Sequence, residues 1–93
     1  MNQSILFSDN EYYNHDLQQV EFHAQCQGRL ILCIISWVTL NTLEQSDLPL
    51  AAANEEAALT LFEAARFDIE DLAETLINQH AFNDDGSITL SHC

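Results

Sequence analysis

The sequence contains no lysine, and its only strong cations are Arg29 and Arg66. Fifteen Asp and Glu residues leave a formal net charge of −13 over 93 residues. Affinity for DNA and RNA comes largely from protein cations that displace counterions from the phosphates. The shortage of cations therefore argues against direct nucleic-acid binding.

Long apolar runs are also absent. The longest, Leu30 to Ile35, is far shorter than the roughly twenty residues that a membrane span needs. The first four residues, Met1-Asn2-Gln3-Ser4, lack the basic and apolar regions of a secretory signal. Three cysteines are an odd number, whereas a small secreted domain normally pairs its cysteines. We therefore expect a cytoplasmic protein with reduced thiols and no membrane association.

Glycine and proline are scarce, with two glycines and one proline in the chain. Gly28 and Gly86 alone cannot build a glycine-rich phosphate loop. No linker, repeat or low-complexity segment divides the chain. Hydrophobic residues make up 47% of it, which is typical of a globular protein. We therefore predict one domain over residues 1–93, with an α+β fold.

The clearest local pattern predicts a β-hairpin. Hydrophobic and polar residues alternate from Val20 to Cys26, and Gln27-Gly28 can form a two-residue turn. That turn would place Cys26 opposite Arg29. The same register pairs the inward-facing apolar residues of both strands, namely Val20, Phe22 and Ala24 with Ile35, Cys33 and Ile31. One face of the hairpin is then purely apolar.

The other face of this hairpin carries Leu30, Leu32 and Ile34 opposite polar residues of the first strand. If helices cover only one side of the sheet, these three aliphatic side chains meet water, as partner surfaces often do. Two alternatives stay open. The first nineteen residues fold over them, with Tyr12 or Tyr13 as the cover, or a second copy of the chain does. We expect a weak homodimer.

Helical spacing replaces the strand pattern in the second half. Ser36 is placed to cap a short helix that ends before Pro49, with Trp37 packing where the sheet meets that helix. Asn54 is placed to cap the first of two main helices, with Arg66 in its last turn. Asp68 is then expected to cap the second main helix.

Short edge strands are expected at Ser4–Phe7 and Ile88–Leu90, the second after an acidic, glycine-containing turn. The predicted fold is a small antiparallel sheet of three to four strands, with both main helices on one face. The expected core consists of Val20, Phe22, Ala24, Ile31, Cys33, Ile35, Leu61, Phe62, Ile69, Leu72, Leu76 and Ile77.

Several motifs together resemble a family of small, acidic bacterial proteins of about ninety residues whose function is unknown. They are Ile5-x-Phe7-x-Asp9, a strand, glycine turn and strand leading to Cys33-x-Ile35-Ser36, Arg66-Phe67-Asp68-Ile69-Glu70, and the acidic turn before Ile88-x-Leu90. The chain departs from the family pattern at Ser8, where proline is usual, and at Phe67, where tryptophan is usual. The resemblance implies an α+β fold and brings no catalytic residue or ligand.

Metal sites are not expected. His23 and Cys26 would point to opposite faces of one strand, and Cys26 and Cys33 would lie roughly 13 Å apart at the usual strand rise. His92-Cys93 stands at a chain end. The segment Asn83–Ile88 resembles a calcium loop, but the positions that should carry carboxylates hold Ala81 and His92. We predict no metal and no cofactor.

Catalysis is the alternative function. Glu21 and His23 would share a strand face and could act together as acid and base on a substrate. Ser36 lacks the Gly-x-Ser-x-Gly setting of a nucleophile. A histidine beside a glutamate on an exposed face is more often a surface pair, so we assign no catalytic residue.

Charge points to a different function. From Trp37 onward the chain carries a net charge of −10, and Glu70, Asp71 and Glu74 would lie together on the last helix. Such a surface can simply keep the protein soluble, or it can attract a basic protein. A mimic of duplex DNA is a special case of the second reading. We predict a non-enzymatic interaction or accessory protein that binds a basic partner.

Overall fold

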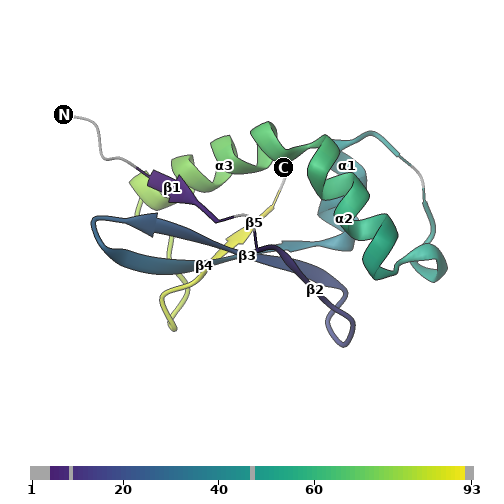
Figure 1. Cartoon of the computed structure of the whole chain (residues 1–93), viewed down its shortest axis with the longest axis horizontal. Helices are drawn as coiled ribbons and strands as arrows, with labels where there is room; N and C mark the ends of the chain where they lie inside the picture. The colour runs from purple at the N-terminus through teal and green to yellow at the C-terminus, as the bar shows by residue number, and fades with distance from the viewer. Residues whose placement is uncertain (1–4, 9, 47, 92–93) are drawn as a thin grey trace.

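Two long strands form the centre of the structure, a computed structural model that describes residues 5–8, 10–46 and 48–91 (Figure 1). β3 (Gln19–Cys26) pairs with β4 (Arg29–Ser36) in the predicted register, from Cys26 opposite Arg29 to Gln19 opposite Ser36. Gln27 and Gly28 both have positive φ angles, 54° and 78°. That backbone is the type I′ turn that closes tight hairpins.

Three short strands complete a five-stranded sheet. β1 (Ile5–Phe7) and β2 (Tyr12–Asn14) both lie antiparallel along the free side of β3. β5 (Ile88–Leu90) lies beside β4 and runs parallel to it. The predicted α+β class with a mostly antiparallel sheet is confirmed. The strand β2 and the parallel direction of β5 were not predicted.

The helices lie on one side of this sheet (Figure 1). They are α1 (Trp37–Leu43), a short 3₁₀ turn η1 (Leu50–Ala52), α2 (Glu55–Ala64) and α3 (Arg66–Asn78). The whole helical segment connects β4 to β5, so the chain crosses over the sheet once and returns in the direction of β4. That crossover explains the parallel pairing of β5.

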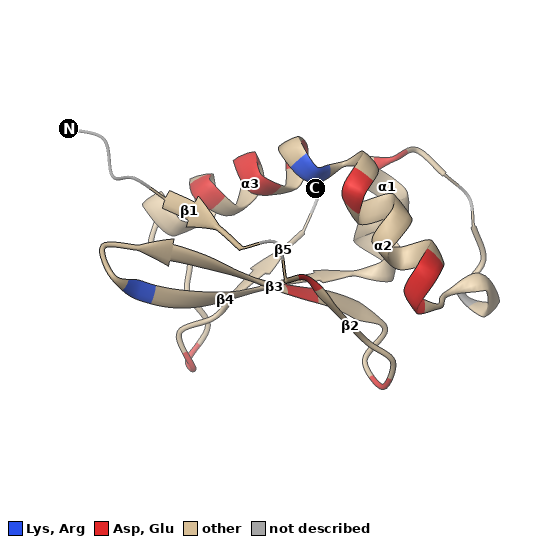
Figure 2. Cartoon of the chain, in the orientation of Figure 1, with Lys and Arg blue, Asp and Glu red and all other residues tan. Residues whose placement is uncertain are grey.

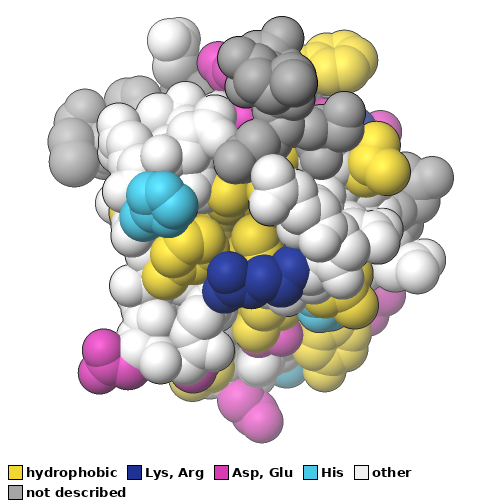
Figure 3. All heavy atoms as spheres, turned by 90° about the vertical axis from the view of Figure 1, so that its left-hand side faces the viewer, with side chains coloured by type: hydrophobic (Ala, Val, Ile, Leu, Met, Phe, Trp, Pro, Cys, Tyr) yellow, Lys and Arg dark blue, Asp and Glu magenta, His cyan; other side chains and the backbone are white. Residues whose placement is uncertain are grey.

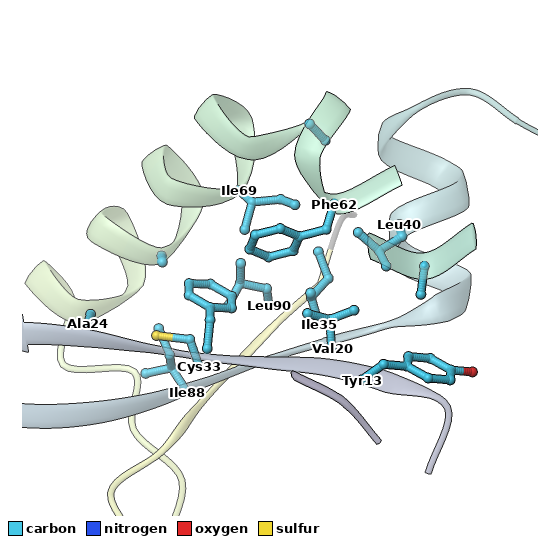
Figure 4. Packing of buried hydrophobic residues seen from close by; sticks show 14 of the residues in the cluster. Tyr13, Val20, Ala24, Cys33, Ile35, Leu40, Phe62, Ile69, Ile88 and Leu90 are labelled. Carbon is cyan, nitrogen blue, oxygen red and sulfur yellow. The ribbon is translucent and has the colours of Figure 1, made fainter. Parts of the chain in front are cut away.

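The core fills the space between sheet and helices (Figure 4). Nine of the twelve expected core residues are buried, whereas Leu61, Leu72 and Leu76 are half-buried and pack on its edge. The Phe22 and Phe62 rings meet edge to face, with centroids 5.2 Å apart. Trp37 is buried at the junction of β4 and α1, as predicted. The buried hydrophobic residues that were not among the twelve are Tyr13, Trp37, Leu40, Ala58, Ala65, Ala73, Ile88 and Leu90.

The helix caps are partly as predicted. The Ser36 hydroxyl accepts from the Thr39 amide, and the Asn54 side chain accepts from the Ala57 amide. The expected cap at Asp68 is wrong. α3 begins at Arg66 directly after Ala65, whose own amide still bonds to Leu61, so no separate capping residue stands between the helices. Arg66 accordingly opens α3 rather than ending α2.

Both α1 and α3 end in the same way. The amide of Ser46 donates to the carbonyl of Asn41 and that of Gln45 to Thr42, and the last turn of α3 repeats this pair of bonds. This is the Schellman motif, which places one residue in the left-handed region, usually glycine. Here Gln45 and His80 occupy that position, with φ angles of 53° and 57°.

Candidate functional site

Acidic residues recur along α2 and α3 (Figure 2). Glu55 and Glu56 are exposed in the first turn of α2, where they complement the helix dipole. On α3, Asp71 and Glu74 are exposed and Glu70 is half-buried. The three predicted acidic residues thus lie on one helix, but the side chain of Glu70 is less exposed to solvent than the other two.

Arg66 lies within this acidic surface and forms ion pairs with three carboxylates. Its guanidinium lies 2.8 Å from Glu11, 2.8 Å from Glu63 and 3.6 Å from Glu70. It also stacks over the Phe62 ring at 5.1 Å. The hydrogen bond from Arg66 lowers the pKa of Glu63 below its ordinary value. The most buried of these pairs joins Glu11, ahead of β2, to the start of α3.

An open groove runs beside α2 next to this network. Its volume is about 580 Å³, and three glutamates line it, namely Glu11, Glu56 and Glu63. Leu59 and Ala64 add apolar wall. The Oε1 atom of Glu11 is buried and has no hydrogen-bond donor, while Oε2 binds Arg66. One carboxylate oxygen of Glu11 therefore has no hydrogen-bond donor among the described residues, although the residue lines this groove.

The other predicted surface is the sheet face away from the helices, which we call the open sheet face. Leu30 is 69% exposed there, and Leu32 and Ile34 are half-buried. Leu6, 64% exposed, and Tyr12 extend this face onto β1 and β2, because they pair with its outward residues. Tyr13 points to the core instead. In the described part of the chain, only loops stand on this side of the sheet (Figure 1).

The six predicted binding residues do not form one surface. Glu70, Asp71 and Glu74 belong to α3, above the sheet, whereas Leu30, Leu32 and Ile34 face the opposite way. The structure therefore separates an acidic surface from an apolar one.

Glu21 and His23 share the open sheet face, as expected, but they are used differently. The Glu21 carboxylate accepts hydrogen bonds from the side chains of Asn14 at 3.0 Å and Gln19 at 2.8 Å. His23 is exposed beside a small depression that Leu6, Gln25 and Leu30 help to line, without Glu21. This arrangement favours a structural role for Glu21 over acid–base chemistry.

Within the described ranges, no three His, Cys, Asp or Glu side chains are grouped so that they could hold a metal ion. His92 and Cys93 lie outside the described residues, as does Ser4. The acidic turn before β5 is a glycine turn, as predicted: Gly86 has a φ of 89°, and Asp85 accepts from the Ser87 amide and hydroxyl. No helix among the described residues is long and apolar enough to cross a bilayer.

The sequence indicated that Glu56 and Glu63 belong to an acidic helix surface, but it indicated neither the groove nor the part that Glu11 plays in it. Glu11 lies 55 residues from Arg66, so no local spacing indicates that they meet. The only local signal was Glu63, three residues before the arginine.

Comparison with known proteins agrees with the predicted resemblance. Residues 5–90 match the family described as "Protein of unknown function (DUF1488)". The uncharacterized protein YrdB of Escherichia coli K12 is 33% identical over 90 residues, which cover 97% of this chain and 99% of that protein. YrdB of Shigella flexneri is 32% identical with the same coverage.

A solved structure shares the fold. The crystal structure of a protein of unknown function from Shewanella loihica PV-4, assigned to the same family, superposes with a TM-score of 0.87. It is 41% identical, and the match covers 99% of this chain and 97% of that one. The chain therefore belongs to the DUF1488 family, a family of small bacterial proteins of unknown function.

Proposed function

We propose that this protein is a non-enzymatic interaction protein that binds a basic partner protein through the acidic surface of α2 and α3. The observation that carries the proposal is the open groove beside α2, which is lined by three glutamates and by no basic residue among those that the structure describes. A lysine or arginine of the partner would pair with Glu56 and Glu63, the exposed glutamates that line this groove. Its aliphatic stem would lie along Leu59 and Ala64 while its charged end reaches the glutamates.

The distribution of charge over the molecule favours a basic partner over an anionic one. Arg66, one of its two arginines, is already engaged by three glutamates. Asp71 and Glu74 have no such cation beside them among the described residues and extend the acidic surface along α3. A field of one sign accelerates encounter with a basic surface and weakens as salt is added.

A cytoplasmic location is part of the proposal, because an odd number of cysteines suits a reducing compartment. The partner should therefore be sought among cytoplasmic proteins. We expect no direct binding to DNA or RNA, since a −13 chain lacks the cations that bind phosphates.

The test is capture of partners from a native bacterial lysate at low and at high salt. The immobilised proteins are the wild type and the triple variant Glu70→Gln, Asp71→Asn, Glu74→Gln. The matched control is Asp16→Asn, Glu44→Gln, Asp84→Asn, which also changes the net charge from −13 to −10 but leaves α2 and α3 unchanged. Glu56→Gln tests the groove alone.

The proposal predicts a basic captured protein that elutes with salt, is captured less by the α3 triple variant and by Glu56→Gln, and is captured normally by the control. Equal capture by all four proteins would contradict it. Release of duplex DNA from the captured partner would identify the interaction as DNA mimicry.

The open sheet face favours a second interaction, a weak homodimer. Leu6 and Leu30 are both more than half exposed, and the acids of α2 and α3 lie on the far side of the molecule. Two copies that meet face to face would bury these apolar side chains while keeping their most acidic surfaces apart.

A further inference from the structure

A pocket of about 150 Å³ opens at the end of the molecule where the β3–β4 turn approaches the end of α3. Ile31 and Ile77 provide apolar lining, and Phe82 adds an aromatic ring. Arg29 and His80 also line the pocket. Figure 3, which views this end of the molecule, shows a cationic and a histidine side chain around exposed hydrophobic side chains.

Arg29 is the unusual member of this set. The chain has fifteen acids and two arginines, and Arg66 binds three glutamates. The Arg29 guanidinium has no carboxylate or hydrogen-bond acceptor among the described residues and instead stacks on the Phe82 ring at 5.3 Å. Stacking uses the flat face of a guanidinium and leaves its N–H edge available for a planar anion.

His80 adds a second donor at a conformational cost. It occupies the left-handed position that ends α3, with a φ of 57°, where glycine would be unstrained. Its ring lies 6.2 Å from that of Phe82, which Arg29 covers. A strained residue that lines a pocket points to a role for its side chain.

We propose that this pocket binds a small monocarboxylate with an apolar body about the size of a benzene ring. The guanidinium edge of Arg29 pairs with the carboxylate, His80 donates to it, and the apolar body rests against Ile31, Ile77 and Phe82. A cavity of about 150 Å³ is known to admit a benzene ring. One guanidinium matches one carboxylate, whereas a doubly charged phosphate would meet the repulsion of a −13 molecule with too few cations.

The first experiment is an NMR titration of the full chain, with benzoate as the probe and benzyl alcohol as its neutral counterpart. Benzoate should shift the amides of residues 27–31 and 77–82 along a saturable curve, and benzyl alcohol should bind at least about tenfold more weakly. Arg29→Gln should weaken benzoate binding about tenfold or more. Asn54→Asp is the matched control, because it also brings the net charge to −14 while retaining a capping side chain on α2.

A second pair of variants separates ligand binding from folding. His80→Gly and Gln45→Gly both replace a left-handed residue with the favoured glycine, so both should remain folded. His80→Gly should weaken benzoate binding, whereas Gln45→Gly, at the end of α1, should leave it unchanged.

A free small molecule and the C-terminus of a peptide both offer a carboxylate. The same NMR titration is therefore repeated with a short peptide that ends in phenylalanine. We expect benzoate to bind more tightly than the peptide. Tighter peptide binding would overturn the assignment to a free small molecule. Shifts that do not saturate, or equal affinities in wild type, Arg29→Gln and His80→Gly, would overturn the site itself.

Discussion

The β3–β4 turn depends on two residues with positive φ, Gln27 at 54° and Gly28 at 78°. Open space surrounds the position where a Cβ would lie at Gly28, so only backbone strain opposes a side chain there. Gly28→Ala should therefore lower the free energy of unfolding by about 1–2 kcal/mol. Gln27→Asn should raise it by about 0.5 kcal/mol, because Asn-Gly is the preferred type I′ sequence.

Urea denaturation of the two variants beside the wild type measures both effects. Opposite signs support the turn assignment. A neutral Gly28→Ala would show that the turn tolerates an ordinary residue.

Cys33 is a buried thiol whose Sγ lies 3.6 Å from the Ile31 carbonyl oxygen. Burial raises the pKa of Cys33 to about 12, although a hydrogen bond from the backbone of Ala24 opposes the shift. Above an unfolded-state pKa of about 8.5, the unfolded thiol loses its proton while the folded one keeps it. The unfolded state then binds fewer protons, so stability falls as the pH rises from about 8.5 toward 12.

The free energy of unfolding, measured by urea titration from neutral pH to about pH 10, should decline more steeply in the wild type than in Cys33→Ala. Identical slopes in the two proteins would mean that the thiol ionises in the folded state.

At the scale of elements, the pair of Arg66 and Glu11 joins the segment before β2 to the junction of α2 and α3. Their side chains are 18% and 16% exposed, whereas that of Glu63 is 65% exposed. Glu11→Gln should therefore destabilise the fold by about 1–3 kcal/mol, because it removes the least exposed of the three carboxylates that pair with the half-buried guanidinium. Glu63→Gln should cost much less, since solvent screens exposed ion pairs.

Thermal unfolding of both variants, with a double-mutant cycle that includes Arg66→Gln, measures the coupling. A larger loss for Glu63→Gln would show that the local pair matters more than the link between elements.

Sequence patterns correctly predicted the elements whose residues interact with near neighbours in the chain. The alternation from Val20 to Cys26 and the two-residue turn determined the hairpin register, and Ser36 and Asn54 marked helix starts correctly. Contacts between distant segments left no local signal. The sequence around Tyr13 resembles a loop because β2 has only three residues and depends on β3 for its partner.

The same reason explains what was missed at the candidate site. Glu70, Asp71 and Glu74 share a helix, so their spacing revealed them. The groove needs Glu11 beside α2, which only the folded chain brings together. The start of α3 was misplaced because Asp68 has a typical capping side chain, while the actual junction at Ala65 has none.

At the scale of the whole molecule, the apolar open sheet face favours the association of two copies, whereas their net charge opposes it. Burying an aliphatic side chain such as Leu30 contributes roughly 1.5–3 kcal/mol, less if burial is partial. Repulsion between two copies of charge −13 weakens as salt shortens the Debye length. We therefore predict a weak homodimer that is more populated at high salt, as sedimentation over a concentration series would reveal.

Leu30→Glu and Leu32→Glu should abolish this dimer. Thr75→Glu adds the same charge on exposed α3 and should preserve it. Leu30 is exposed, so its variant should fold even if the Leu32 variant does not. A wild type that is monomeric at every salt concentration would contradict the dimer.

Association kinetics with the captured partner measure whether the acidic surface of α2 and α3 attracts a basic protein. We predict that the triple variant Glu70→Gln, Asp71→Asn, Glu74→Gln associates about three- to tenfold more slowly than the wild type at about 0.1 M salt, with little change in dissociation. The difference should vanish near 1 M salt, where the Debye length is about 3 Å. Equal association rates at low salt for the wild type, this variant and the Asp16→Asn, Glu44→Gln, Asp84→Asn control would contradict the account.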